Sequence, residues 1–251
     1  MVYFVGAGPG AIDLITVRGM RLLEKADVII YAGSLVNPEL LGYAKSGALI
    51  LNSAEMTLDE VLGSVFKAEK EGKMTVRLHT GEPSIYGAVR EQMDALDRKG
   101  IRYESVPGVS ACFGAAASLN IEYTLPGVSQ TLIITRLAGK TAVPESESIS
   151  SLASHKASMA VYLSAGMLGK LSEELMKGGL DPSTPAAIVY RATWPDDKKI
   201  VCHLSDLPKA AAQNKITKTA VVLVGKAVTH ELYSKSRLYA EDFETEFRKR
   251  K

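Results

Sequence analysis

The stretch VYFVGAGPG, residues 2–10, decides how the N-terminal half of this chain folds. Its apolar start, Val2–Val5, predicts a buried strand, and a run of glycine and proline follows at once, from Gly6 to Gly10. A glycine-rich loop directly after a first strand is typical of nucleotide-binding folds, because bare backbone lets a ligand approach closely. The spacing of Gly6, Gly8 and Ala11 fits the dinucleotide pattern loosely.

A site for a nicotinamide dinucleotide needs two further features that this chain lacks. An acidic residue should end the second strand to hold the ribose, but that strand runs into Tyr31-Ala32-Gly33. Pro9 also removes one of the N–H groups that would cradle a pyrophosphate. Two interpretations remain, a structural tight turn and a close-packed loop beside a ligand without a pyrophosphate, and the second is favoured.

The first half alternates short β-branched runs with helical patterns, which predicts a largely parallel sheet covered on both faces and hence an α/β fold. The predicted strands are Val2–Val5, Asp27–Tyr31, Ala48–Leu51, Thr75–Leu78 and Arg102–Val106, and the predicted helices are Val17–Lys25, Thr57–Lys70 and one after Gly87.

The second half has more strand-like runs and fewer clear helices, which predicts a mixed α/β unit. Strand-like runs occupy residues 131–136, 159–164, 186–192, 198–204 and 220–228, and clear helices occupy only 168–177 and 207–214. The third and fourth runs form a hairpin in this interpretation, with Trp194–Asp197 at the turn. We therefore expect domains at residues 1–120 and 121–230, followed by a charged tail at 231–251 that is a solvated helix or a frayed end.

The amino-acid composition argues against some classes of function but assigns none. The 251 residues are 46% hydrophobic and 23% charged with a net charge of +2, so no overall field attracts nucleic acid. No leader or membrane span is recognisable, and we expect a cytoplasmic protein with no membrane partner. Cys112 and Cys202 are expected to be buried free thiols rather than a disulfide or a nucleophile, and the four histidines lack metal-ligand spacing, so no metal site is expected.

Two further loops interrupt the predicted first sheet at strand ends. HTGEPSIYG, residues 79–87, places Glu82 and Tyr86 where open α/β sheets bind ligands. VPGVSA, residues 106–111, places Ser110 at the start of a helix that is almost entirely small residues. That helix either packs closely on its sheet or points its N-terminus at a ligand. We call Gly6–Gly10 the first loop, Thr80–Val89 the second loop and Pro107–Ser110 the third loop.

These stretches, with TRLAGKTAVPE and YRATWPDDK in this order, resemble the tetrapyrrole (corrin/porphyrin) methyltransferase family over residues 1 to about 230. The resemblance implies two α/β domains with a ligand trough between them, usually in a homodimer, and S-adenosylmethionine (SAM) as methyl donor. Within the family the match is closest to the branch that methylates C-11 of precorrin-4 or cobalt-precorrin-4 in cobalamin biosynthesis. It leaves open whether the substrate contains cobalt. A cofactor without phosphates would explain a first loop that contains Pro9.

Residue by residue, the resemblance implies cofactor contacts from Pro9, Thr80, Gly81, Glu82, Ile85, Ser110, Ala111, Leu163, Ala192, Thr219 and Ala220. The substrate carries several carboxylates, for which cationic and N–H donors are suited, and the implied substrate-binding residues are His79, Tyr86, Arg136, Lys140 and Arg191. We expect Arg136 and Lys140 to lie on a linker between the domains.

This chain departs from the family pattern at three places. Ala11-Ile12 replaces Asp-Pro after the first loop, Glu82 replaces the Asp of GDP, and the YAGSLVN stretch lacks the Asp of the uroporphyrinogen enzymes. No catalytic acid or base is assigned, because a ring N–H of the substrate can lose the proton.

Three alternatives stay open. One is methylation of a tetrapyrrole at C-17 or C-20, or of uroporphyrinogen. Another is methylation of a macromolecule by the same fold, and the third is a non-catalytic tetrapyrrole carrier.

Overall fold

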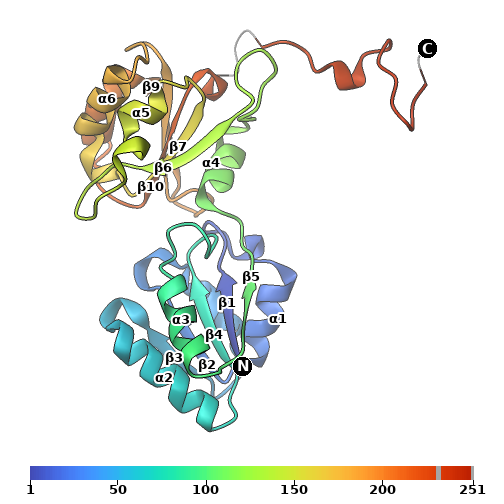
Figure 1. Cartoon of the computed structure of the whole chain (residues 1–251), viewed down its shortest axis with the longest axis vertical. Helices are drawn as coiled ribbons and strands as arrows, with labels where there is room; N and C mark the ends of the chain where they lie inside the picture. The colour runs from blue at the N-terminus through green and yellow to red at the C-terminus, as the bar shows by residue number, and fades with distance from the viewer. Residues whose placement is uncertain (230–232, 250–251) are drawn as a thin grey trace. The chain divides into compact units, whose positions relative to one another are not determined.

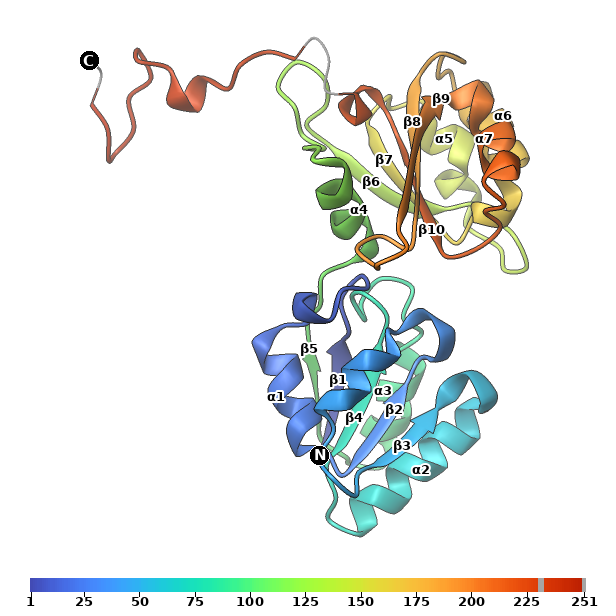
Figure 2. The same ribbon diagram turned by 180° about the vertical axis from the view of Figure 1, so that it is seen from behind.

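The computed structural model describes residues 1–229 and 233–249, which form two units. The first unit comprises Met1–Ala115 together with Arg191–Asp197, and the second comprises Ala116–Tyr190 and the residues from Lys198 on. Each unit contains its own five-stranded sheet (Figures 1 and 2). The expected fold class, two α/β units, is therefore confirmed. The domain limits at residues 120 and 230 stay a prediction.

The sheet of the first unit is entirely parallel, in the order β3-β2-β4-β1-β5. Its strands are β1 (Val2–Gly6), β2 (Val28–Tyr31), β3 (Leu49–Asn52), β4 (Thr75–His79) and β5 (Tyr103–Val106). Helix α1 (Val17–Lys25) covers one face, and α2 (Leu58–Lys70) and α3 (Arg90–Arg98) cover the other (Figure 1). Every predicted strand and helix of this half is present, within about three residues at each end.

Burial on both faces explains why these strands read as continuous apolar runs. Along β1, Val5 packs into the core beneath α1, whereas Val2 and Phe4 pack into the core beneath α2 and α3. The helices begin where side chains cap them: the Thr16 side chain accepts a hydrogen bond from Gly19 N, and Thr57 with Glu60 forms a capping box.

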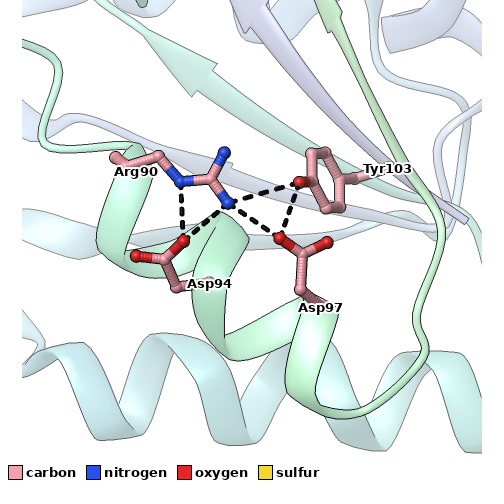
Figure 3. A network of polar contacts seen from close by, with 4 residues as sticks. All are labelled: Arg90, Asp94, Asp97 and Tyr103. Atoms are coloured by element: carbon pink, nitrogen blue, oxygen red, sulfur yellow. Dashed lines mark hydrogen bonds and ion pairs between the residues drawn. The ribbon is translucent and has the colours of Figure 1, made fainter.

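A surface network fastens α3 to the edge strand β5 (Figure 3). Arg90 lies between Asp94 and Asp97 at 2.7 and 2.8 Å, and the Tyr103 hydroxyl donates to Asp97 Oδ2 at 3.1 Å. The Tyr103 ring in turn meets Phe4 edge to face, with centroids 6.0 Å apart. The ions are exposed, so the network contributes little to stability and mainly fixes the helix against the strand.

The sheet of the second unit is mixed, in the order β6-β7-β10-β8-β9, with β6 and β7 parallel and the other pairs antiparallel. Its strands are β6 (Leu132–Arg136), β7 (Ser158–Tyr162), β8 (Pro185–Tyr190), β9 (Lys198–His203) and β10 (Ala220–Val224). Three helices pack into one core with it, α5 (Ile149–Ala153), α6 (Leu168–Lys177) and α7 (Leu207–Gln213). The predicted β8–β9 hairpin is confirmed.

Helices α5 and α4 differ from the other helices in length and in position. Helix α5 was not expected from the sequence, because five residues are too few to show helical periodicity. Helix α4 (Ala111–Leu119) begins in the first unit and ends in the second.

Of the tail expected at 231–251, the described residues 233–249 contain a short 3-10 helix, Arg237–Tyr239. His230, Glu231, Leu232 and the last two residues lie outside the described part. Cys112 is buried as expected, whereas Cys202 is only half-buried, with its pKa raised by burial and by the charge of Asp206. Across residues 1–229 and 233–249, no helix is long and apolar enough to span a membrane, and no His/Cys/Asp/Glu cluster could hold a metal ion.

Candidate cofactor site at the edge of the first sheet

The first, second and third loops meet at one edge of the first sheet. They follow β1, β4 and β5, which are neighbours in the sheet and end at the same edge because they are parallel. The first and second loops pair directly: Gly81 N donates to Gly8 O at 3.0 Å, and Gly8 N donates to Gly81 O at 3.4 Å. Both glycines have positive φ, +80° at Gly8 and +58° at Gly81, a conformation that residues with a side chain disfavour.

Contact between bare backbones explains the glycines at the ends of β1 and β5. A Cβ added at Gly6 would lie 2.5 Å from Gly81 O and 2.6 Å from the Cα of Gly108. A Cβ at Gly108 would lie only 2.2 Å from Gly81 O. The sequence suggested that bare backbone serves a ligand, but at Gly6 and Gly108 it serves first to let the three loops touch.

Glu82 ties the second loop to the third. Its Oε2 accepts from Gly108 N at 2.8 Å and its Oε1 accepts from Ser84 N at 2.9 Å. Partial burial opposes ionisation, but the N–H groups of Ser84 and Gly108 together hold the pKa of Glu82 below its ordinary value. The carboxylate is therefore ionised at neutral pH and structural in its contacts, a role that the sequence did not reveal.

Two polar side-chain atoms at the end of β4 are buried without a hydrogen bond. Among the described residues these are His79 Nε2 and Thr80 Oγ1. His79 is only 4% exposed, and burial together with the charge of Arg77 lowers its pKa to about 3. Such a histidine is neutral at physiological pH and cannot offer a positive charge to a carboxylate, so any substrate contact it makes is that of an uncharged imidazole.

Arg77, the source of that charge, is a buried cation on β4. Its Nη1 donates to Ile30 O at 3.0 Å and its Nε to Gln92 Oε1 at 3.2 Å. Burial lowers the pKa of Arg77 to about 10, which still leaves it charged at neutral pH. Gln92 in turn is bonded to the second loop, because its Nε2 donates to Ala88 O at 2.9 Å.

The second loop is held in a strained form at its far end. Tyr86 and Ala88 have positive φ, +56° and +49°, and a Cβ at Gly87 would lie 2.1 Å from Pro83 O. Ile85 N closes a turn on Glu82 O at 3.2 Å. Tyr86 is 44% exposed.

The third loop leads into α4, which packs against the first loop. Ser110 is buried and its carbonyl accepts from Phe113 N and Gly114 N at 3.0 and 3.1 Å, which starts the helix at Ala111 as expected. A Cβ at Gly114 would lie 2.6 Å from the Cβ of Pro9. The small residues of α4 thus permit a close contact, and its partner includes the first loop.

The segment Arg191–Asp197, here called the Trp194 loop, also contacts the first loop and belongs to the first unit. Trp194 Nε1 donates to Pro9 O at 3.2 Å, and Ala11 N donates to Thr193 Oγ1 at 3.0 Å. Ala192 of the same loop is buried. Thr193 and Trp194 were missed as site residues, because no spacing along the chain relates them to Pro9.

The expected site residues of the second unit share one edge of its sheet. Leu163 follows β7 and Thr219 precedes β10, and these strands are antiparallel, so the end of one lies beside the start of the other at Ala220. Leu163 is 63% exposed, and Leu163 and Thr219 both have positive φ. Arg136 ends β6 at the same edge, opposite Tyr162.

The expectation that Arg136 and Lys140 lie on a linker between domains is wrong. Both lie inside the second unit: Arg136 is the last residue of β6, and Lys140 lies on the connection from β6 to α5. The Arg136 guanidinium folds back on that connection, donating to Thr141 O at 3.1 Å and Ala142 O at 2.6 Å. Lys140 is exposed. Arg191 is ion-paired with Asp196 at 2.6 Å rather than free for a substrate carboxylate.

Comparison with known proteins agrees with this geometry. Residues 1–208 match the family model of the tetrapyrrole (corrin/porphyrin) methylases. The chain is 50% identical over 248 residues to a cobalt-precorrin-4 C(11)-methyltransferase of Methanocaldococcus jannaschii, covering 99% of this chain and 96% of that one.

Two solved structures are similar over most of the chain. A cobalt-precorrin-4 methyltransferase superposes with a TM-score of 0.89 at 46% identity, covering 90% of this chain and 95% of that one. A uroporphyrin-III C-methyltransferase of Thermus thermophilus, solved with S-adenosyl homocysteine, superposes with a TM-score of 0.75 at 25% identity, covering 93% and 95%. The chain therefore belongs to the tetrapyrrole (corrin/porphyrin) methylase family.

Proposed function

We propose that this protein is a SAM-dependent C-methyltransferase that methylates C-11 of precorrin-4 or cobalt-precorrin-4 in corrin ring biosynthesis. The observation that carries the proposal is the junction of three glycine loops at one sheet edge, in a chain that is 50% identical to a cobalt-precorrin-4 C(11)-methyltransferase over nearly its full length. The loops supply the place for the cofactor, and the relative supplies the substrate class.

The residues of this edge fit a sulfonium cofactor better than a phosphate-bearing one. Pro9 has no N–H to donate, Gly8 N and Gly81 N are already engaged with each other's carbonyls, and Glu82 adds a negative charge. These features disfavour an anion and suit a group that carries positive charge. The buried Thr80 Oγ1, which has no hydrogen bond, supplies a polar atom for a ligand at the same place.

In this proposal Pro9, Gly81, Ile85, Ser110, Ala111 and Ala192 shape the cofactor site of the first unit, and Thr80 and Glu82 give it polarity. When bound, SAM supplies a methyl group already activated by the positive sulfur. The protein's task is alignment with the ring carbon, and effective molarities of about 10⁵–10⁸ M show how much of a barrier positioning can remove. For Leu163, Thr219 and Ala220 the cofactor role remains the proposal that the family resemblance makes.

The proton balance requires no protein base. With SAM bound as donor, the transfer to C-11 would be balanced by a proton that a ring N–H of the substrate releases to solvent, so no side chain of this chain needs to accept it. His79 matches this, since a pKa of about 3 makes it a weak base. We assign it the role of an uncharged polar contact.

The substrate's carboxylates call for exposed donors. Tyr86 of the first unit, and Lys140 and Arg136 of the second, are the proposed contacts, with Arg136 offering the donors that its two loop carbonyls leave free. Arg191 is a weaker candidate because Asp196 and the Trp194 ring already occupy its guanidinium. A homodimeric assembly and a cytoplasmic location are further parts of the proposal, testable by sedimentation and by cell fractionation.

The test is to incubate the protein with SAM bearing a ¹³C-labelled methyl group and with precorrin-4 or cobalt-precorrin-4, separately, and to locate the new methyl by NMR. We expect it on C-11, and the faster substrate identifies whether cobalt is present. A methyl on C-17, C-20 or a uroporphyrinogen ring would replace the substrate assignment. The absence of transfer to any tetrapyrrole, with transfer to RNA or protein instead, would overturn the proposal.

A further inference from the structure

The backbone of the first loop is fixed by side chains from distant parts of the chain. Trp194 Nε1 donates to Pro9 O at 3.2 Å and Thr193 Oγ1 accepts from Ala11 N at 3.0 Å. Between them, Gly10 O accepts from Asn37 Nδ2 at 2.9 Å. Three consecutive residues thus have a backbone polar group satisfied by a side chain rather than by water, which leaves the loop little freedom to move.

Gly10 lies directly against the indole of Trp194. A Cβ added there would lie 2.0 Å from Trp194 Cδ1 and 2.4 Å from its Nε1. The ring therefore occupies the volume that any side chain at residue 10 would need. The glycine of the first loop and the tryptophan of the Trp194 loop are complementary, although 184 positions separate them in the sequence.

Arg191 also contacts the indole of Trp194. Its guanidinium lies 4.0 Å from the centre of the Trp194 ring, and its Nη1 is 2.6 Å from Asp196 Oδ2. Asp196 thereby orients the guanidinium on the ring, where cation–π attraction favours the contact.

The backbone of the Trp194 loop is strained to make these contacts. Arg191 and Thr193 have φ of +47° and +68°, a left-handed conformation that residues with a side chain rarely adopt. Strain of this kind persists only where surrounding contacts over-determine it, and it gathers at functional sites.

We propose that Arg191, Thr193 and Trp194 are positioning residues that hold Pro9–Ala11 in the form that binds the methyl donor. They act on cofactor affinity and not on the tetrapyrrole carboxylates. The inference rests on the proposed function in one respect, that the first loop faces the cofactor. It assigns Arg191 a different role from the carboxylate contact that the family resemblance implied.

The experiment uses the full chain and S-adenosylhomocysteine as the probe. Trp194→Phe keeps the ring and removes the donor to Pro9, Thr193→Val keeps the shape and removes the acceptor for Ala11, and Arg191→Gln removes the cation. Lys198→Gln is the matched control, because it removes an exposed cation from the same hairpin. Calorimetry is expected to show about 3- to 10-fold weaker binding in each of the first three variants, the loss of one hydrogen bond or cation–π contact, and no change in the control.

Steady-state kinetics separates positioning from a merely structural role. The expected result is a KM for SAM raised by a similar factor, with the KM for the tetrapyrrole within about twofold of wild type. A second readout is the indole N–H resonance, which is unique because the chain has one tryptophan. In wild type and Lys198→Gln its exchange with solvent should be slow, and in Arg191→Gln it should be faster.

The outcomes are distinct. If Arg191→Gln raises the KM for the tetrapyrrole and leaves S-adenosylhomocysteine binding unchanged, Arg191 is a substrate ligand and the inference is overturned. If the three variants lower the melting temperature but change neither ligand's affinity, the contacts are only structural and it is overturned equally. If wild type itself binds no S-adenosylhomocysteine, the proposed function fails first.

Discussion

Glu82 and Gly108 are joined by a 2.8 Å hydrogen bond that crosses from the second loop to the third. An aspartate at position 82, as the family resemblance leads one to expect, would be shorter by one methylene. The longer side chain of this chain spans to the neighbouring loop and holds a backbone N–H that would otherwise be left without a partner. Glu82 thus joins the third loop to the second, as the Gly8–Gly81 pair joins the second to the first.

We predict that Glu82→Ala lowers the free energy of unfolding by roughly 1–3 kcal/mol, because Gly108 N and Ser84 N each lose their acceptor. Chemical denaturation measures the change, with Glu91→Ala, an exposed acid on α3, as the control. Because the folded pKa of Glu82 is depressed, its contribution is full above pH 4.5 and fades as pH falls through the lower folded value. Equal stability of Glu82→Ala and wild type at pH 7 would contradict this assignment.

Gly108→Ala should be far more damaging than its size suggests. The added methyl would stand 2.2 Å from Gly81 O and 2.7 Å from Gly6 Cα, so the loops must separate. We expect loss of S-adenosylhomocysteine binding and a melting temperature lowered by several degrees. Gly63→Ala on α2 is the matched control, since nothing lies within 4 Å of its Cβ and alanine is favoured in a helix by roughly 0.5–1 kcal/mol. Two variants of equal stability would refute the close-contact account.

The buried His79 should make the free energy of unfolding depend on pH. Its folded pKa is about 3 and its ordinary value is 6.5, so between these values the unfolded chain binds one more proton than the folded protein. Stability from this group is complete above pH 6.5 and falls by about 1.4 kcal/mol per pH unit below it.

Removing the histidine should therefore flatten the stability profile. Between pH 7 and pH 5, His79→Gln should lose about 2 kcal/mol less than wild type. Urea denaturation at a series of pH values measures this, and His155→Gln, which removes an exposed histidine, should keep the wild-type slope. Parallel profiles for His79→Gln and wild type would show that His79 is not buried neutral.

S-adenosylhomocysteine should stabilise the protein and NAD should not. Binding to the folded state alone adds about 2.7 kcal/mol at a hundredfold excess over Kd, which raises the melting temperature. The reason for the contrast lies in Pro9 and in the engaged amides of Gly8 and Gly81, which leave no cradle for a pyrophosphate. Differential scanning fluorimetry with both ligands at equal concentration is the measurement. A comparable shift with NAD would reinstate a dinucleotide site.

The sequence predicted what local chemistry determines. Apolar runs located the ten strands of the described residues, and helical patterns located α1 and α2 to within a residue at each end. The five-residue helix α5 was missed because so short a segment carries no periodicity. The three loops were predicted at strand ends, and a parallel sheet brought them together as expected.

Contacts between distant residues were beyond prediction from local patterns. Nothing along the chain pairs Trp194 with Gly10, and the role of Glu82 depends on a partner 26 residues away. His79 and Arg191 were expected to meet the substrate as polar or cationic groups. Burial leaves the first neutral, and Asp196 with Trp194 occupies the second. A sequence shows which residues can carry charge, but not whether burial neutralises them or neighbouring groups already pair with them.

The membership of Arg191–Asp197 in the first unit has a consequence for biosynthesis on the ribosome. The continuous part of this unit ends at Ala115, and the 75 residues Ala116–Tyr190 of the other unit must be translated before Trp194 exists. At about 5–20 residues per second, that is a delay of roughly 4–15 s. During this interval the first sheet can form while Pro9 O and Ala11 N have only water as partner. The contacts of the Trp194 loop with Pro9 and Ala11 are thus the last part of the first unit to form in each nascent chain, and a truncated chain that stops before residue 191 has the glycine loops without these contacts.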